Sequence, residues 1–160
     1  MKKIIFVCHG NICRSPMAEF IFRHLAAEAG LSGEFDVSSA AVSCEEQGNG
    51  LYPPAAQTLR RHGIPFGDHR AHRITPHEFA SADLIVIMDS SNRRLLDRLT
   101  QQPASPKVRK MMQFTGTSDD VADPWYTGDF EQTYSDLFAA CSAMLEKITR
   151  PGNEGSRTEV

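Results

Sequence analysis

The chain has 160 residues and a mass of 17.7 kDa, and its 41% hydrophobic and 23% charged residues are typical of a globular domain. We expect one domain over residues 1–150 and a frayed polar tail over residues 151–160. The formal net charge of −3 argues against general nucleic-acid binding, which usually needs a basic surplus, and no apolar segment is long enough to span a membrane.

The four cysteines, Cys8, Cys13, Cys44 and Cys141, are few and irregularly spaced. The apolar run that begins after Lys3 is too short for a signal peptide, so we expect a cytoplasmic protein. We further expect a monomer or a weak dimer. Thiols stay reduced in that compartment, and reactive or buried thiols are commoner there than disulfides. Cys44 and Cys141 are expected to be structural.

The first half of the chain predicts two strands and two helices. Short β-rich apolar runs mark the strands, while apolar residues at spacings of three and four mark the helices. In chain order these are a strand over Lys3–Val7, a helix opened by Pro16 with Ser15 as its cap and ended by Gly30, a strand over Phe35–Ser39, and a helix from Pro53 to His62.

The second half begins with the strongest strand, the continuous apolar run Leu84–Met88. Such runs are typical of a parallel sheet that is covered on both faces. A helix over Asp89–Leu99, a fourth strand over Val108–Met112 and a long final helix over Phe130–Ile148 follow. We therefore predict an α/β fold of three layers, in which a four-stranded parallel sheet carries helices on both faces.

Ligands of open parallel sheets bind beyond the carboxyl ends of the strands. The segment Cys8–Ser15 follows the first strand, Asp89 follows the third, and the segment after Ser39 follows the second. We expect these segments, together with the loop that holds Asp123, to meet at one edge of the sheet.

The segment between the first strand and the first helix predicts a phosphate-binding loop. Its amide groups should point inward, and the helix dipole adds positive potential, which suits a tetrahedral dianion. Gly10 and Asn11 tolerate a left-handed backbone, and Arg14 can donate a planar fork of hydrogen bonds to two phosphoryl oxygens. The loop residues are Cys8, His9, Gly10, Asn11, Ile12, Cys13, Arg14 and Ser15.

Cys8, at the base of this loop, is the candidate nucleophile. The loop amides, Arg14 and the Ser15 hydroxyl favour its thiolate, which can attack phosphorus and form a cysteinyl-phosphate. This chemistry requires no metal, and Cys8, His9 and Cys13 lack a second ligand pair at metal-binding spacing, so we expect no cofactor.

A second, protonated group must supply a proton to the leaving group, and Asp123 is the candidate general acid. Pro124 stiffens its loop, and Trp125 and Tyr126 offer flat faces to an aromatic leaving group. Two rivals lie close in sequence but lack the aromatic companions, namely Asp119 and Asp120. Because the acid must start protonated, activity is expected to peak on the acid side of neutral.

The run Cys-His-Gly-Asn-Ile-Cys-Arg-Ser-Pro-Met-Ala-Glu closely resembles the active-site loop of the low-molecular-weight protein tyrosine phosphatases. The resemblance extends in order from about Lys3 to Ile148. Further matches are Ser38-Ser39-Ala40, Tyr52-Pro53-Pro54-Ala55, His62-Gly63-Ile64, Met88-Asp89 and Asp123-Pro124-Trp125-Tyr126.

This resemblance implies a phosphatase of phosphotyrosine proteins with Cys8, Arg14 and Asp123 as its catalytic residues. It also implies a hydrogen-bond network from Asn11 to Ser39 and His69, and a redox role for Cys13. An oxidised Cys8 would be trapped by Cys13 as a reversible disulfide; the alternative for Cys13 is a small buried side chain under the loop.

Ile12 and Glu45 bear on substrate choice at the rim of the site. The arginine phosphatases that resemble this chain carry threonine at the position of Ile12, so Ile12 favours phosphotyrosine. Many tyrosine-specific members place an aromatic residue near Glu45, where this chain has Glu45-Glu46; the acidic pair either selects basic peptides or is simply solvated.

Three other functions remain as alternatives. A protein arginine phosphatase differs by only one loop residue. An arsenate reductase on the same fold needs further cysteines, and none lies between Cys44 and Cys141. A non-catalytic phosphate-binding module is disfavoured because the candidate nucleophile, arginine and acid are all present.

Overall fold

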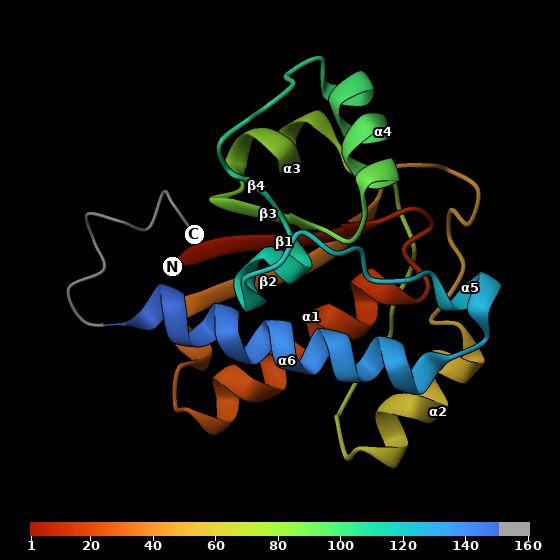
Figure 1. Cartoon of the computed structure of the whole chain (residues 1–160), viewed down its shortest axis with the longest axis vertical. Coiled ribbons are helices and arrows are strands. Elements are labelled where there is room, and N and C mark those ends of the chain that lie inside the picture. Colours follow the sequence, from red (N-terminus) through yellow and green to blue (C-terminus); the bar gives the residue numbers. More distant parts are fainter. Residues whose placement is uncertain (151–160) are drawn as a thin grey trace.

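The computed structural model describes residues 1–150, so the polar tail expected over residues 151–160 lies outside the described residues. None of the helices in the described part is long and apolar enough to cross a membrane. The elements, in chain order (Figure 1), are β1 (Lys2–Cys8), α1 (Arg14–Glu28), η1 (Ser32–Glu34), β2 (Phe35–Ala41), α2 (Pro53–Arg61), α3 (Pro76–Ser81), β3 (Leu84–Ile87), α4 (Ser90–Thr100), β4 (Val108–Lys110), η2 (Met111–Thr115), α5 (Pro124–Thr127) and α6 (Phe130–Thr149).

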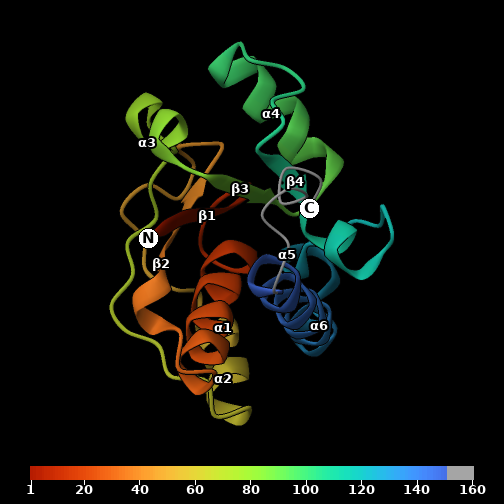
Figure 2. The same cartoon turned by 90° about the vertical axis from the view of Figure 1, so that its left-hand side faces the viewer.

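The four strands form one parallel sheet in the order β2-β1-β3-β4. The central strand β1 pairs on both sides, so that Ile4 lies opposite Val37 of β2 and Leu84 of β3. Figure 2 shows α1, α2 and α6 below the sheet and α3 and α4 above it. The predicted three-layer α/β fold is confirmed.

The side chains of β1 alternate between two cores, which explains why the strand is apolar throughout. Ile4 and Phe6 pack with α1 and α6, whereas Ile5 and Val7 pack on the opposite face with α3 and α4. All four side chains are completely buried. Burial on both faces fixes the register of β1 and therefore the position of the loop that follows it.

Several element boundaries differ from the sequence prediction by one or two residues, among them the start of α1 and the end of β4. Helix α1 begins at Arg14, before the predicted start at Pro16, because the carbonyl of Cys13 already accepts a hydrogen bond from the amide of Met17 at 3.0 Å. The Ser15 hydroxyl does not cap the helix and lies near Cys8 instead. Strand β4 ends at Lys110, and the remaining residues of the predicted strand open the 3-10 turn η2.

Helix α3 was not predicted, although the sequence contains its start signal. Thr75 accepts a hydrogen bond from the amide of Glu78, and the Glu78 side chain accepts one from the amide of Thr75. This is a capping box, with Pro76 in the first turn. A helix of six residues is too short to show the apolar periodicity on which the prediction relied.

Phe6 tests the core on the α1 side of the sheet. Its ring is completely buried and packs against Phe22 with centroids 6.0 Å apart. Phe6→Ala should lower the free energy of unfolding in urea by about 3–5 kcal/mol, because the deletion leaves a cavity. Phe138→Ala is the control, since Phe138 is 37% exposed and its loss should cost less than about 1 kcal/mol. Equal losses for the two variants would contradict this account of the core.

Candidate active site

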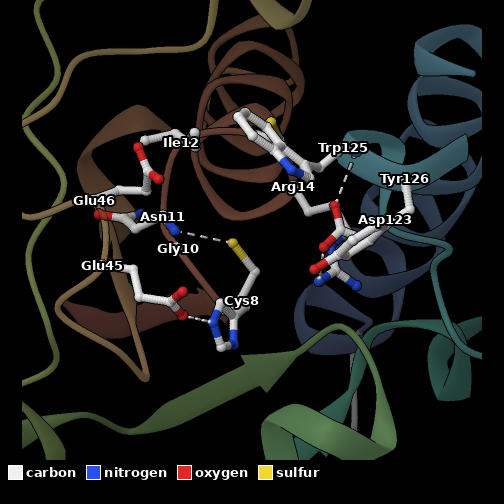
Figure 3. Close-up of a pocket in the computed structure, with 12 residues that line it drawn as sticks. Cys8, Gly10, Asn11, Ile12, Arg14, Glu45, Glu46, Asp123, Trp125 and Tyr126 are labelled. Atoms are coloured by element: carbon white, nitrogen blue, oxygen red, sulfur yellow. Dashed lines mark hydrogen bonds and ion pairs between the residues drawn. The ribbon is translucent and has the colours of Figure 1, made fainter. Parts of the chain in front are cut away.

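The sulfur of Cys8 lies inside the turn that joins β1 to α1. The carbonyl of Cys8 accepts a hydrogen bond from the amide of Val42 at 3.1 Å, which ties its backbone to the segment after β2. Its Sγ accepts hydrogen bonds from the amides of Asn11 and Ser15, at 3.3 and 3.4 Å. The Ser15 hydroxyl lies 3.1 Å from the same sulfur. These donors converge on the sulfur and would stabilise a thiolate. Figure 3 shows the contact from Asn11.

Asn11 gives the loop its turn. It has a φ of 62°, in the left-handed region, and its side chain is completely buried. The side-chain amide nitrogen donates to the hydroxyls of Ser15 (2.8 Å) and Ser39 (3.0 Å), while Oδ1 accepts from the backbone N–H of His72 (3.2 Å). Each of these bonds opposes a rotation of the amide, so the backbone of Asn11 is held in its strained conformation.

Glu19 determines which group donates and which accepts in the hydrogen bonds around Ser39 and Asn11. A carboxylate only accepts, so the Ser39 hydroxyl must donate to Glu19 at 2.6 Å, and its oxygen is left to accept from Asn11. Asn11 also donates to the Ser15 oxygen, so the Ser15 proton can go to Cys8 Sγ at 3.1 Å or to the carbonyl of Ala40 at 3.4 Å. Glu19 is buried and is also paired with Arg23 at 2.7 Å.

Residues 69–72 support the same loop from outside. Nε2 of His69 lies 2.6 Å from the carbonyl oxygen of Asn11, and because a carbonyl only accepts, that nitrogen carries the proton. The side chain of His72 pairs with Glu78 of α3 at 2.8 Å, which holds the backbone N–H that Asn11 uses. Sequence reasoning named His69 but not His72, Glu78 or Glu19.

Gly10 departs from the expectation for the loop. Its φ is not positive; among the loop residues only Asn11 adopts the left-handed conformation. Glycine here leaves room for Glu46, because a Cβ on Gly10 would lie 3.2 Å from Cγ of Glu46, closer than an ordinary contact. Gly10 thus allows the segment that carries Glu46 to pack closely on the loop.

Arg14 joins three parts of the site. Its side chain is only 2% exposed, and its guanidinium donates to Asp89 (2.7 Å) and to the carbonyl of Val121 (2.8 Å). It also lies 3.4 Å from Asp123. Burial lowers the pKa of the guanidinium, but Cys8 and the two carboxylates raise it above its ordinary value, so Arg14 is always charged. Asp89, which caps α4, was predicted at this edge without a contact to Arg14.

Asp123 lies across the cavity from the Cys8 loop. One carboxylate oxygen accepts from the amide of Trp125 at 3.0 Å and caps the short helix α5, while the other faces Arg14. The rival Asp120 is turned away and pairs with Lys110 at 2.5 Å. Neither Asp119 nor Asp120 lines the cavity, whereas Asp123 does.

The cavity has a volume of about 180 Å³ and opens between two different walls. Figure 3 shows Glu45 and Glu46 on one side of Cys8 and Trp125 and Tyr126 on the other. Trp125 is 52% and Tyr126 84% exposed, so both present free ring faces at the mouth. Ile12 also lines the cavity but is itself buried.

The remaining cysteines have different environments. Cys13 lines the cavity and is buried; burial and the neighbouring Cys8 raise the pKa of its thiol far above the ordinary value. Burial alone does the same for Cys141 in α6. Cys44 is exposed, so the expectation that it is structural is wrong. Within residues 1–150, no three His, Cys, Asp or Glu side chains are grouped to hold a metal ion.

Asn11 offers a test of the loop that does not depend on activity. Asn11→Gly relieves the backbone strain but loses three side-chain hydrogen bonds, and should lower the free energy of unfolding by about 2 kcal/mol. Asn11→Ala keeps the strain and should lose about 1 kcal/mol more. Urea denaturation measures both.

Gln101 is the matched control because it also has a positive φ, of 55°, but lies exposed at the end of α4. Gln101→Gly should raise stability slightly, by up to about 1 kcal/mol. A stabilising effect of Asn11→Gly as well would show that the side-chain bonds do not hold the loop.

Comparisons with known proteins agree with this geometry. The human low molecular weight phosphotyrosine protein phosphatase is 40% identical over 153 residues, covering 91% of this chain and 95% of that protein. The crystal structure of YfkJ from Bacillus subtilis superposes with a TM-score of 0.88 at 36% identity, over 92% of this chain and 94% of that one. The Drosophila arginine phosphatase DARP gives a TM-score of 0.83 at 29% identity, over 94% and 98% of the two chains.

The family model described as "Low molecular weight phosphotyrosine protein phosphatase" matches residues 3–154. The match covers almost the whole chain, including every residue of the cavity described above. The chain therefore belongs to the low molecular weight phosphotyrosine protein phosphatase family.

Proposed function

We propose that this protein hydrolyses phosphotyrosine in proteins, and small aryl phosphates, through a cysteinyl-phosphate on Cys8. The observation that carries the proposal is the convergence of two amides and the Ser15 hydroxyl on Cys8 Sγ, with Arg14 and Asp123 at the same cavity. This arrangement supplies a nucleophile, a phosphate-binding cation and a proton donor within one site.

In the first step the Cys8 thiolate attacks phosphorus on the side opposite the tyrosine oxygen. The S–P bond forms while the P–O bond to tyrosine breaks, and Asp123 transfers a proton to the departing phenolate. Arg14 and the loop amides bind the phosphoryl oxygens, whose charge is greatest in the transition state. Asp89 and the Val121 carbonyl hold the guanidinium in place for this contact.

In the second step water attacks the phosphorus of the cysteinyl-phosphate. Asp123, now a carboxylate, takes a proton from that water, the P–S bond breaks, and inorganic phosphate leaves with Cys8 again a thiolate. The Ser15 hydroxyl, 3.1 Å from Cys8 Sγ, can donate to this thiolate and stabilise it as the leaving group.

Tyrosine is the preferred substrate residue because of the mouth of the cavity. Trp125 and Tyr126 present exposed rings that can stack on a phenyl group, and Tyr52 packs behind Trp125 with centroids 4.9 Å apart. Ile12 adds an apolar contact at the cavity. Phosphoarginine remains the second candidate because the fold of the Drosophila arginine phosphatase is closely similar.

Loss of Cys8 and loss of Asp123 should have different signatures. Cys8→Ser should lower turnover of every substrate by about 10⁴-fold or more, because no nucleophile replaces the thiolate. Asp123→Ala should cost about 10²–10⁴-fold on a phosphotyrosine peptide but much less on p-nitrophenyl phosphate, whose better leaving group needs little protonation. Steady-state rates in chelator, with a matched phosphoarginine peptide, measure these effects.

Cys44→Ser and Asp120→Ala are the matched controls, since neither side chain lines the cavity, and both variants should retain wild-type turnover. Turnover that survives Cys8→Ser would overturn the proposed mechanism. A preference for the phosphoarginine peptide would keep the mechanism and overturn the substrate.

We also propose that Cys13 protects Cys8 from irreversible oxidation. The raised pKa keeps Cys13 a thiol, so it does not compete for phosphorus, yet it lines the same cavity as Cys8. Peroxide would oxidise the Cys8 thiolate to a sulfenic acid; the Cys13 sulfur would then attack that sulfur, form a disulfide and release water.

Peroxide inactivation should therefore be largely reversed by dithiothreitol in the wild type. In Cys13→Ser the sulfenic acid has no thiol partner in the cavity and proceeds to the sulfinic acid, so recovery should fall several-fold. Cys44→Ser should behave like the wild type. Equal recovery in all three proteins would contradict a protective role for Cys13.

A further inference from the structure

The wall of the cavity opposite the aromatic rings is acidic. Glu45 and Glu46 both line the cavity, and they belong to the segment that follows β2. Figure 3 shows them across Cys8 from Trp125 and Tyr126. A phosphotyrosine whose phosphate reaches Cys8 must therefore have its neighbouring residues pass over one or both of these walls.

Glu46 lines the cavity with a neutral hydrogen-bond partner. Its Oε1 accepts a hydrogen bond from the side chain of Asn49 at 2.9 Å, which is a neutral partner. It forms no ion pair within the part of the chain that the structure describes. Its Cγ would lie 3.2 Å from a Cβ at position 10, so the Glu46 side chain lies beside the phosphate-binding loop.

Glu45 is held at the mouth by His9. The His9 ring nitrogen Nε2 is hydrogen bonded to Oε2 of Glu45, and the Ser43 hydroxyl donates to the carbonyl of His9 at 3.0 Å. The hydrogen bond with His9 lowers the pKa of the Glu45 carboxyl, so Glu45 stays ionised in mildly acidic solution. The side chain of Glu45 is 66% exposed and remains open to a ligand.

The mouth lacks cations that could offset these carboxylates. Among the residues that line the cavity, the only lysine or arginine is Arg14, which is buried at the base and already bound to Asp89. His9, the other basic residue, is engaged by Glu45. The phosphate thus meets positive potential deep in the site, whereas residues beside the phosphotyrosine meet negative potential.

We propose that Glu45 and Glu46 form an acidic rim that selects phosphotyrosine flanked by lysine or arginine and disfavours phosphotyrosine flanked by acidic residues. The inference rests on the proposed function and specifies its substrate class. A basic side chain next to the phosphotyrosine would pair with the rim, while an acidic one would be repelled by it. Ion pairs at exposed sites are weak, so the two carboxylates together should change kcat/KM by about three- to tenfold.

The test uses three phosphotyrosine peptides that differ only in the flanking residues, which are lysine, alanine or glutamate. For each protein the measured quantity is the ratio of kcat/KM for the lysine peptide to that for the glutamate peptide, in which any general effect of a variant on chemistry or folding cancels. The wild-type ratio should be about tenfold at low salt. It should fall toward one at about 1 M salt, because salt then screens charges that are more than about 3 Å apart.

E45Q/E46Q should reduce the ratio to near one, and E45K/E46K should invert it. The matched control is E28K/E146K, which changes the net charge by the same amount as E45K/E46K. Its two glutamates lie outside the cavity, and their side chains are 65% and 74% exposed. The control should keep the wild-type ratio.

Equal kcat/KM for the three peptides in the wild type would overturn the acidic rim and leave the proposed phosphatase intact. An equal shift of the ratio in E28K/E146K and E45K/E46K would also overturn it, because net charge alone would then explain the preference. Absence of turnover on all peptides and on p-nitrophenyl phosphate would overturn the proposed function and the rim with it.

Discussion

The left-handed backbone of Asn11 is held by its own side chain, whose amide bonds to two hydroxyls and one backbone N–H. If that amide were released, the loop could relax and its N–H groups would no longer converge on Cys8. The same amide donates to the Ser15 oxygen, whose hydroxyl lies 3.1 Å from Cys8 Sγ. Geometry and electrostatics at the nucleophile thus depend on one buried, strained residue.

The parallel sheet explains how distant segments reach the loop that contains Asn11 and Arg14. β1 lies between β2 and β3, so the ends of all three strands lie at one edge, and Cys8 ends the central one. Ser39 arrives from β2 and Asp89 from the end of β3. The layers on each side of β1 fix its register, so the start of the loop is held in position by a buried strand.

Most of the fold, and the residues Cys8, Arg14 and Asp123 as a group at one cavity, could be predicted from the sequence. Continuous apolar strands and a loop before a helix are local patterns that can be recognised in the sequence alone. Residues that act through long-range contacts could not be found this way. Glu19 ends the recognised run and His72 lies outside it, but the sequence shows the role of neither, because both roles arise from hydrogen bonds to residues 20 and 61 positions away.

Gly10 shows a further limit, since its residue type correctly indicated a backbone requirement but not which one. The sequence suggested conformational freedom, whereas the structure requires space for Glu46. A glycine in the sequence is compatible with either requirement, conformational freedom or space for a neighbouring side chain. Only the neighbour, which lies 36 residues further along the chain, distinguishes them.

Arg14, the first residue of α1, connects that helix to the end of β3 and to the loop before α5. Its positive charge separates two carboxylates, Asp89 and Asp123, that would otherwise repel each other across a partly buried gap. The same side chain therefore serves phosphate binding and holds the parts of the site together. Loss of this arginine would therefore leave two carboxylates without the cation that they share.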